Sequence, residues 1–332
     1  MTTSNALVKV IGGTRLAGRY RVQGSKNIAL HLYAATVLAD APVTLHNAPD
    51  IVDSGVCARI LQHTGMGADF DGTTFTTMLL AARAEGTSLI TSPSIEPEVT
   101  ETARFLSARG VGIVFDGQSL LVTGTDYIGG GEFTVAGDRI EAATVAMATA
   151  ATRGTVTLDG IALADLPDGL TGPLTAAGLT LTPPADRATG HLPAVEAVAG
   201  PLTAVETRTG PHPGLPTDTA PQLAAMLTQA TGTSLIRERI YPQRDTHAEP
   251  LRAFGARVRS TGNLIRVRGG KPLRAADVEA ADIRAVTALV LAALAADGTS
   301  TIRGLHHLRR GYGHLLDGLA TLGADITVEP EV

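Results

Sequence analysis

Gly-Thr-Ser-Leu-Ile-Arg at 232–237 recurs as Gly-Thr-Ser-Thr-Ile-Arg at 298–303, and each copy follows a run of small apolar residues. A loop, a second helical pattern and a segment opened by Gly come after it, as in Gly-Ala-Asp-Ile-Thr at 323–327. A unit of this kind cannot bury its own apolar helix, so several copies must pack around shared helices. Strand starts of the same type stand at Ala41-Pro42-Val43, Gly86-Thr87-Ser88 and Gly154-Thr155-Val156.

Each copy predicts the outline β-α-β-α-β-β, with an apolar first helix and an amphipathic second helix. The first helices should be buried on most sides, and the sheets should lie outside them. Short strands are expected at 87–91, 155–159, 233–237 and 299–303. The expected first helices are residues 27–39, 73–84, 140–152, 219–231 and 283–296, and the clearest second helices are 99–109 and 312–322.

The spacing of the copies is irregular at one place. The strand starts stand at 41, 86, 154, 232 and 298, so the first interval is 45 residues and the others are 66 to 78. Judged by the repeat's own period, a segment is absent between the first two copies. Residues 67–72 run directly into the apolar helix expected from Thr73.

Composition bounds the classes of protein to which the chain can belong. Its 332 residues carry a net charge of -5, which argues against general nucleic-acid affinity. The single cysteine, Cys57, excludes an internal disulfide and fits a reducing compartment. The apolar run from Ala285 to Ala296 is too short to span a bilayer, and the start lacks a signal-peptide pattern. We therefore expect a cytoplasmic protein that binds neither membrane nor nucleic acid.

Charged residues gather where the apolar helices begin and in the loops after the strands. Helix N-termini carry partial positive charge and free amides, so several that converge can bind phosphate or carboxylate. Arginine strengthens such a site because it grips an oxyanion with two hydrogen bonds. Taken singly, an Asp at a helix start is usually a cap, and a loop Arg is usually solvated. The repeated pattern favours a small anionic substrate; its residues are Lys26, Asn27, Asp138, Arg139, Asp218, Arg244, Asp282, Arg284 and Arg310.

Several stretches resemble UDP-N-acetylglucosamine enolpyruvyl transferase, whose fold is shared by the related enolpyruvylshikimate phosphate synthase. They are VQGSKNIAL at 22–30, GPHPGLPTD at 210–218, RIYPQRDTHAEPLRAFGA at 239–256, ADIRA at 281–285 and RRGYGHLLDGLATLGA at 309–324. The resemblance implies an α/β fold of inside-out barrel lobes built from repeated βαβαββ units, here five units instead of six. It also implies a truncated first lobe of two units over 21–134. The second lobe then has three units, formed by 1–20 with 135–332.

The resemblance also implies roles for single residues. Enzymes of this family move the enolpyruvyl group of phosphoenolpyruvate onto a hydroxyl and release phosphate. Lys26 then matches a lysine that binds phosphoenolpyruvate, Asn27 a residue that touches the sugar substrate, and Asp218 the carboxylate that takes the acceptor's proton. Such chemistry needs a base near the hydroxyl and fixed cations for the donor, and it needs no metal or other cofactor. Arg244, Asp282, Arg284 and Arg310 match residues around phosphoenolpyruvate and a moving loop, and Arg139 belongs to the same substrate-binding group.

The unit that carries the family's catalytic loop is missing, so the usual acid is missing too. A further family lysine is replaced by Val52. Cys57 does not stand in for the acid, because its surroundings predict an amphipathic helix and a buried thiol. His247, in the loop after Arg244, is the better candidate by position and stands where the shikimate enzyme has a catalytic glutamate. A loop histidine bonded to backbone remains the alternative.

Three functions compete on this evidence. The first is an enolpyruvyl transferase with a trimmed lobe, acting on a small or nucleotide-like acceptor in specialised metabolism. The second is a cleft reassigned to elimination, isomerisation or cyclisation of an anionic substrate, with Asp218 and His247 as the acid–base pair. The third is a non-catalytic binding or scaffold protein. A lobe that lacks one unit can expose apolar helix surface, which favours a homodimer through that lobe in any of the three.

Overall fold

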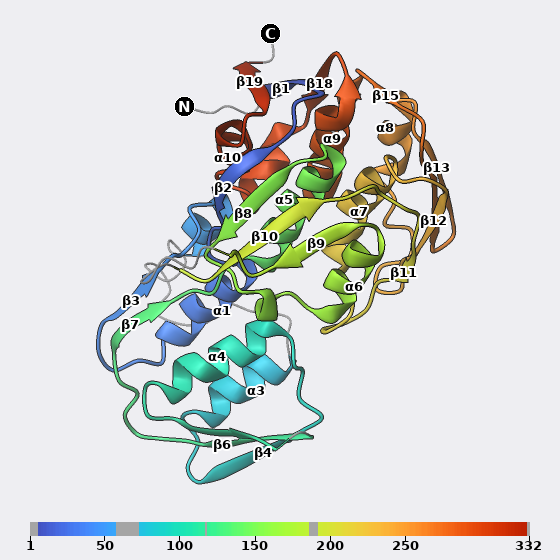
Figure 1. The fold of residues 1–332 in the computed structure, drawn as a ribbon. Coiled ribbons are helices and arrows are strands. Elements are labelled where there is room, and N and C mark those ends of the chain that lie inside the picture. The colour runs from blue at the N-terminus through green and yellow to red at the C-terminus, as the bar shows by residue number, and fades with distance from the viewer. Residues whose placement is uncertain (1–5, 58–72, 117, 186–191, 331–332) are drawn as a thin grey trace. The chain divides into compact units, whose positions relative to one another are not determined.

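The computed structural model describes residues 6–57, 73–116, 118–185 and 192–330. The chain divides into two compact units, which are described separately below. Unit 1 comprises residues 1–22 and 138–332, and unit 2 comprises residues 23–137. Helices and strands alternate along both units (Figure 1).

Unit 1 contains three four-stranded sheets that share one pattern of strand directions. In each sheet the first pair in the order is parallel and the next two pairs are antiparallel. The orders are β2-β8-β10-β9, β11-β12-β14-β13 and β16-β18-β1-β19. Their bounds are β2 Ala17–Arg21, β8 Thr155–Asp159, β10 Ala194–Ala199, β9 Leu179–Thr182, β11 Glu206–Arg208, β12 Thr233–Arg237, β14 Leu264–Arg268, β13 Arg257–Thr261, β16 Asp277–Glu279, β18 Thr299–Arg303, β1 Ala6–Ile11 and β19 Asp325–Pro330.

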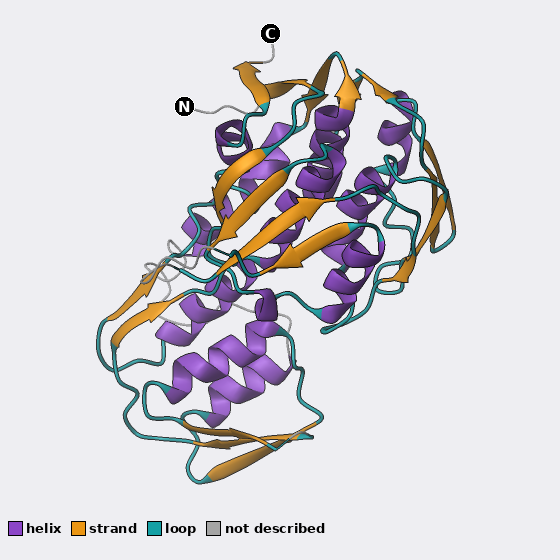
Figure 2. Ribbon diagram, in the orientation of Figure 1, coloured by secondary structure: helices purple, strands orange, loops and turns teal. Residues whose placement is uncertain are grey.

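Three apolar helices form the core of unit 1: α5 (Arg139–Ala151), α7 (Ala220–Leu227) and α9 (Ile283–Ala295). Each contacts the other two, and nearly every residue of each is buried. The strands of unit 1 lie around these helices (Figure 2). Such helices can pack closely because Ala dominates α5 and α7, which lets their backbones approach. The prediction of helices buried on most sides is confirmed for these three.

Shorter elements complete unit 1. The second helices α6 (Asp168–Ala176) and α8 (Ala248–Ala253) pack on β9 and β13, and α10 (Leu315–Thr321) packs on β2 and β19. Two short strands, β15 (Leu273–Arg274) and β17 (Ala296–Asp297), form a parallel pair. The 3-10 turns are η1 (Leu163–Asp165), η2 (Thr217–Thr219) and η3 (Leu305–Arg310).

Unit 2 holds the helices α1 (Lys26–Thr36), α3 (Thr73–Ala81) and α4 (Pro97–Ser107). A parallel pair joins β3 (Val43–His46) to β7 (Gly131–Thr134), and a separate antiparallel sheet has the order β4-β6-β5. Its strands are β4 Thr87–Thr91, β6 Ser119–Thr123 and β5 Gly112–Phe115. Among the residues that the structure describes, β3–β7 has only the parallel part of the unit 1 pattern, and β4-β6-β5 has only the antiparallel part.

The first helices of unit 2 differ from the prediction of burial on most sides. Helix α1 buries only Ile28, Ala29, Leu32 and Ala35, and Leu80 of α3 is 70% exposed while Met78 is buried. In unit 1 each first helix contacts two others of its kind, whereas the described part of unit 2 contains two first helices, α1 and α3. The junction at 67–72, where the repeat is interrupted, lies outside the described residues.

The four strands expected at 87–91, 155–159, 233–237 and 299–303 are confirmed with the same bounds as β4, β8, β12 and β18. Within each of them more exposed and less exposed residues alternate, as a strand with one face toward the core requires. In the described part of the chain, no helix is long and apolar enough to cross a membrane.

Candidate active site

Asp218 joins the beginnings of two central helices in unit 1. It lies in η2, directly before α7, and Arg284 lies in the first turn of α9. Arg284 Nε donates to Asp218 Oδ1 at 2.5 Å, and Arg244 Nη1 donates to the same oxygen at 2.9 Å. The Asp218 side chain is 36% exposed, whereas those of Arg244 and Arg284 are less so. Oδ2 of Asp218 accepts no hydrogen bond from the described residues, so it can accept one from a bound hydroxyl.

Arg244 is held from both sides by neighbours in its own segment and in η2. Its Nη1 also donates to Thr217 Oγ1 at 2.8 Å, and its guanidinium lies 4.0 Å from the centre of the Tyr241 ring. A guanidinium over an aromatic face gains cation–π attraction. The side chain is therefore oriented before any ligand arrives.

Glu238 organises the segment that carries Arg244, and the sequence analysis missed it. Its side chain is 2% exposed. Oε1 accepts from Thr209 Oγ1 (2.8 Å), from the Ile240 amide (2.8 Å) and from the Tyr241 amide (2.9 Å). Oε2 accepts from Thr217 Oγ1 at 2.8 Å, so one buried carboxylate links the residue after β11, η2 and the loop after β12. Glu238 sits among charged neighbours at the end of a strand, where sequence alone predicts a solvated side chain.

Asp282 caps α9. Its Oδ1 accepts from the amides of Arg284 (2.8 Å) and Ala285 (2.9 Å), and its Oδ2 accepts from Thr246 Oγ1 at 2.7 Å. Burial alone raises the pKa of this carboxyl, but these hydrogen bonds and the charge of Arg284 together hold the pKa below its ordinary value. Burial likewise lowers the pKa of Arg284, but the Asp218 carboxylate outweighs it and raises that pKa. Both groups are therefore charged at neutral pH.

The beginning of α5 supplies a third set of polar groups. Asp138 caps this helix by accepting from the amides of Ile140 (2.8 Å) and Glu141 (3.3 Å). Glu141 is fully buried and accepts a hydrogen bond from the hydroxyl of Tyr20. Burial and the Glu141 carboxylate raise the pKa of Tyr20 far above its usual range, so the phenol stays protonated. Arg139, the first residue of α5, is also buried and so lies away from bulk water.

A hydrogen-bonded group ties the beginnings of α5 and α7 to Tyr312. Thr144 Oγ1 and the Tyr312 hydroxyl lie 3.2 Å apart, and Gln222 Nε2 lies 3.4 Å from each oxygen. Helix α5 also contacts η2, which carries Asp218. The N-terminal ends of all three central helices therefore meet in one region of unit 1. Their partial positive charges make that region favourable for a phosphate or carboxylate.

His247 is placed differently from what a proton donor needs. Its side chain is fully buried, and neither ring nitrogen has a hydrogen-bond partner among the residues that the structure describes. Burial lowers its pKa to about 4, although Asp245 and Asp282 act in the opposite direction. The imidazole is therefore neutral at pH 7. It lies in the loop that joins Arg244 to α8, where it packs rather than faces solvent.

Arg310 ends η3, the turn that packs on α9, and its side chain is exposed. The preceding His306 and His307 have ring centres 4.0 Å apart. Burial lowers the pKa of His307, and the charges of His306 and Arg310 lower it further. Asp282 opposes that shift, so η3 and the cap of α9 are electrostatically coupled.

Lys26 and Asn27 belong to unit 2, where they open α1. Ser25 caps this helix, and its hydroxyl lies 3.5 Å from the Ile28 amide. Lys26 Nζ lies 2.7 Å from Asp53 Oδ2, and both side chains are about one quarter exposed. Asn27 is exposed. The sequence analysis anticipated Lys26 at a helix start but gave no signal for Asp53 as its ion-pair partner.

Two smaller expectations concern cysteine and metals. Cys57 is 4% exposed, which confirms a buried thiol, and burial raises its pKa. Within the described ranges, no group of three or more His, Cys, Asp or Glu side chains is arranged to hold a metal ion.

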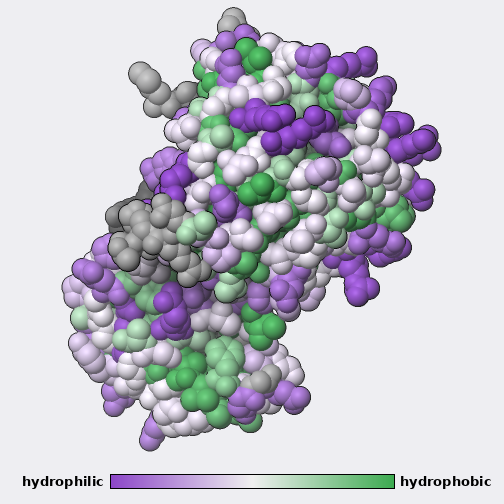
Figure 3. Space-filling model, viewed as in Figure 1, coloured by the Kyte–Doolittle hydropathy of each residue, from purple (hydrophilic) through white to green (hydrophobic). Residues whose placement is uncertain are grey.

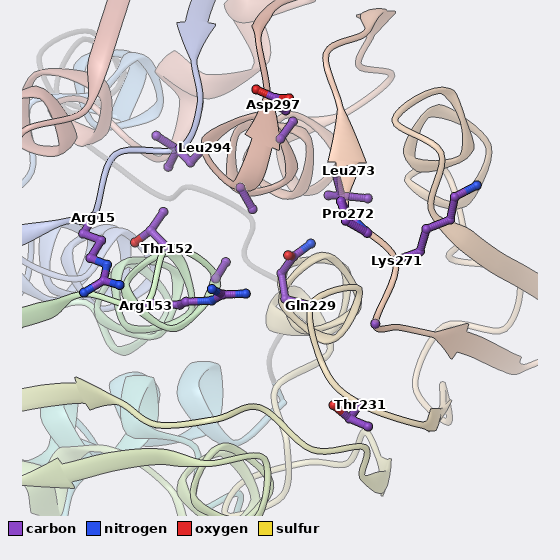
Figure 4. Close-up of a pocket in the computed structure, with 15 residues that line it drawn as sticks. Arg15, Thr152, Arg153, Gln229, Thr231, Lys271, Pro272, Leu273, Leu294 and Asp297 are labelled. Atoms are coloured by element: carbon purple, nitrogen blue, oxygen red, sulfur yellow. The ribbon is translucent and has the colours of Figure 1, made fainter.

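A separate cavity lies at the other ends of the three central helices. It has a volume of about 580 Å³ and is lined by the last residues of α5 and α9, by residues that follow α5 and α7, and by neighbouring loops (Figure 4). Arg153 extends toward Gln229 across this cavity, and Lys271 points away from it. This cavity is distinct from the candidate site, because it lies at the C-terminal ends of the central helices and Asp218 and Arg284 lie at their N-terminal ends.

Comparison with known proteins places this architecture in a family. The sequence model of EPSP synthase (3-phosphoshikimate 1-carboxyvinyltransferase) matches residues 70–319. The chain belongs to this family of enolpyruvyl, or carboxyvinyl, transferases. It is 31% identical over 417 residues to a UDP-N-acetylglucosamine 1-carboxyvinyltransferase of Hyphomonas neptunium, an alignment that covers 96% of this chain and 97% of that protein.

One further relative and one solved structure are similar to this chain. UDP-N-acetylglucosamine 1-carboxyvinyltransferase 2 of Geobacillus kaustophilus is 28% identical over 420 residues, covering 96% of both proteins. The crystal structure of the enolpyruvyl transferase NikO from Streptomyces tendae shares the fold, with a TM-score of 0.87 and 24% identity. That match covers 99% of this chain and 100% of the NikO chain. Because the sequence alignments are longer than the 332 residues of this chain, those two carboxyvinyltransferases carry segments without a counterpart here.

Proposed function

We propose that this protein transfers the enolpyruvyl group of phosphoenolpyruvate to a hydroxyl of a small or nucleotide-like acceptor and releases phosphate. The observation that carries the proposal is the pair of arginines on one oxygen of Asp218, at the meeting point of α7 and α9. That arrangement orients Oδ2 of Asp218 for a hydroxyl proton while two fixed cations remain beside it. A base and preorganised cations are what this transfer needs.

The arginines have a second role in the proposal. Phosphoenolpyruvate carries a carboxylate and a phosphate, and Arg244 and Arg284 each have donors beyond those that reach Asp218. Arg310 at the end of η3 adds a cation that is exposed. Lys26 of unit 2 is proposed to bind phosphoenolpyruvate, and Asn27 to contact the acceptor, as the family resemblance implies. Asp282 supports this set by capping α9. Arg139, at the start of α5, is proposed to belong to the substrate-binding group, as the family resemblance implies.

His247 does not enter the proposed reaction. A fully buried imidazole that is neutral at pH 7 is a very weak acid and is shielded from solvent, so we do not assign it the protonation of the methylene carbon. This observation favours transfer over elimination or isomerisation by an Asp218–His247 pair. We propose instead that the proton donor for the methylene carbon is an exposed group of η3, such as His306.

The size of the acceptor is proposed from the length of the chain. The two carboxyvinyltransferases act, by name, on UDP-N-acetylglucosamine, and both contain segments that this chain lacks. A shorter chain offers less surface to a large nucleotide sugar. We therefore propose a smaller acceptor and a role in specialised metabolism.

The test is phosphate release from phosphoenolpyruvate with a panel of nucleosides, nucleotides and other small alcohols. The wild-type protein should release phosphate with at least one acceptor. Asp218→Asn should lower the rate about 100-fold or more, as expected for loss of a general base. Asp297→Asn, which changes an exposed carboxylate at the far ends of the helices, serves as the matched control. If no compound of the panel supports phosphate release, the transferase proposal is overturned. An unchanged rate of phosphate release in Asp218→Asn overturns the assignment of the base.

We also propose that unit 2 forms a homodimer. In the β4-β6-β5 sheet, Leu89 opposes Leu121, and Leu121 opposes Val114; Leu89 is 59% exposed and Val114 is 57% exposed. Hydrophobic surface also covers unit 2 where α3 and α4 lie (Figure 3). Exposed apolar rows favour association. Sedimentation analysis should give a dimer, and Leu89→Lys with Val114→Lys should give a monomer; a monomeric wild type contradicts the proposal.

A further inference from the structure

The outer face of one sheet in unit 1 carries an unusual concentration of arginine. In β13 and β14 buried and exposed residues alternate, so Val258 and Val267 face the core and the arginines beside them face solvent. Because the two strands pair antiparallel in register, Arg257 lies directly opposite Arg268 and Arg259 directly opposite Arg266. In the view of Figure 3, hydrophilic side chains project along the edge where Figure 1 labels β12 and β13.

This arrangement is electrostatically unfavourable without a partner. Like charges directly opposite one another destabilise a pair of strands. Among the described residues, Arg259, Arg266 and Arg268 form no ion pair with a carboxylate, and Arg257 uses one nitrogen to donate to the Gly269 carbonyl at 2.8 Å. The whole chain nevertheless has a net charge of -5, so the patch is a local exception.

The four arginines define a small rectangle. Opposite residues have Cβ atoms about 5 Å apart, and residues two apart along a strand are about 7 Å apart. Arg252 of α8 adds a fifth cation, and a groove of about 1190 Å³ runs over the set. A guanidinium pair can grip one phosphate group with several charge-assisted hydrogen bonds. Two pairs at this spacing match an anion with at least two phosphate groups.

The surroundings limit the size of the ligand. Strand β13 is the edge of the sheet, so the patch stops on that side. On the other side, Thr233 and Leu235 of β12 oppose Arg268 and Arg266, and neither is charged. Arg237 lies two residues beyond Leu235 and is paired with Arg208 of β11, so basic residues continue only diagonally from the set, past the uncharged Thr233 and Leu235. These limits favour a compact anion over a long polyanion.

We propose that Arg257, Arg259, Arg266 and Arg268 form a binding site for a small oligophosphate anion, separate from the candidate active site. The shared chemistry is a chain of phosphate groups, whether inorganic or the tail of a nucleotide. The proposal does not depend on the reaction that the protein catalyses.

Calorimetric titration with tripolyphosphate at low and high salt tests this site. The wild-type protein should bind, and more weakly at high salt because exposed charges are screened. Arg259→Gln with Arg266→Gln removes one cross-strand pair and should weaken binding about tenfold or more, the equivalent of losing one charge-assisted contact. Arg15→Gln, an exposed arginine elsewhere in unit 1, should bind as the wild type does. Adenosine triphosphate in place of tripolyphosphate distinguishes a nucleotide tail from a free oligophosphate.

A stability measurement keeps the test independent of ligand choice. Arg266→Glu places a carboxylate opposite Arg259, so it should raise the melting temperature at low salt while it abolishes tripolyphosphate binding. A fall in melting temperature at low salt contradicts the like-charge argument. Three results overturn the proposal: no binding by the wild type, unchanged binding in the double variant, or tighter binding of a charge-matched oligonucleotide, which identifies a nucleic-acid surface instead.

Discussion

Replacement of Glu238 by alanine tests whether this buried carboxylate holds the segment that presents Arg244. The substitution removes the acceptor of four hydrogen bonds, from the hydroxyls of Thr209 and Thr217 and from the amides of Ile240 and Tyr241. The side chain is 2% exposed, so water cannot replace it without rearrangement of the loop. All four donors then lose a charged acceptor at once.

The cost follows from these contacts. A hydrogen bond contributes about 1 kcal/mol, and a buried donor left unsatisfied costs about 1–3 kcal/mol. Ile240 and Tyr241 are exposed residues, so water can satisfy their amides once the loop has rearranged. We therefore expect Glu238→Ala to lower the free energy of unfolding by about 3 kcal/mol, or the melting temperature by about 6–12 °C for a unit of this size. Glu238→Gln keeps an acceptor at Oε1 and a donor toward Thr217, so it should cost only about 1 kcal/mol.

Chemical denaturation followed by circular dichroism measures both variants. Glu206→Ala is the matched control, because this carboxylate is exposed on β11 of the same sheet and should change stability by no more than about 0.5 kcal/mol. If Glu238→Ala unfolds with the same free energy as Glu206→Ala, the carboxylate does not organise the segment. Equal losses in Glu238→Ala and Glu238→Gln would show that charge, rather than the hydrogen-bond pattern, sets the effect.

Three further substitutions give definite outcomes. His247→Leu should leave stability at pH 7 unchanged or raised, because it removes two unsatisfied ring nitrogens. Since the folded pKa of His247 is about 4 and the unfolded value is about 6.5, the wild type should lose about 3 kcal/mol as pH falls through that window, and the variant should not; pH-dependent denaturation checks both. Gly318→Ala should destabilise by about 1–3 kcal/mol, measured by thermal melting, because its Cβ would lie 2.2 Å from the Tyr20 ring; stabilisation contradicts that packing. Asp282→Ala should cost about 1 kcal/mol by loss of the α9 cap, and Asp282→Asn much less, in the same denaturation assay.

Local periodicity was enough to predict most of the fold. Four strands of the repeat, β4, β8, β12 and β18, were predicted with their exact bounds because alternation over five residues is a strong local signal. Helices α5 and α9 were predicted to within one residue at each end, because runs rich in Ala, Leu and Val favour a buried helix. The helix expected over 219–231 is shorter, since α7 ends at Leu227. Burial of α1 and α3 was predicted less well, since it depends on how many neighbouring helices unit 2 contains, and a helix's own sequence does not report that number.

Some residues of the candidate site could likewise be predicted from the sequence, and others could not. Asp218, Asp282 and Arg284 stand at recognisable helix starts, so their place near helix N-termini could be predicted from the pattern. Glu238 could not, because a glutamate between two arginines looks solvated until the fold buries it. His247 is the converse case: its position between Arg244 and α8 suggests chemistry, but packing removes it from solvent and keeps it neutral.

The sequence by itself determined the repeated unit, its helices and strands, and the types of charged residue available for an anionic substrate. These features depend on the pattern of polar and apolar residues over a few turns, which neighbours in the chain specify. Only the tertiary structure decided that Arg244 and Arg284 share one oxygen of Asp218, that Glu238 is buried, and that four arginines face one another across β13 and β14. Each of these contacts joins residues from different strands, turns or helices, and register and packing alone set their distances and their exposure to water.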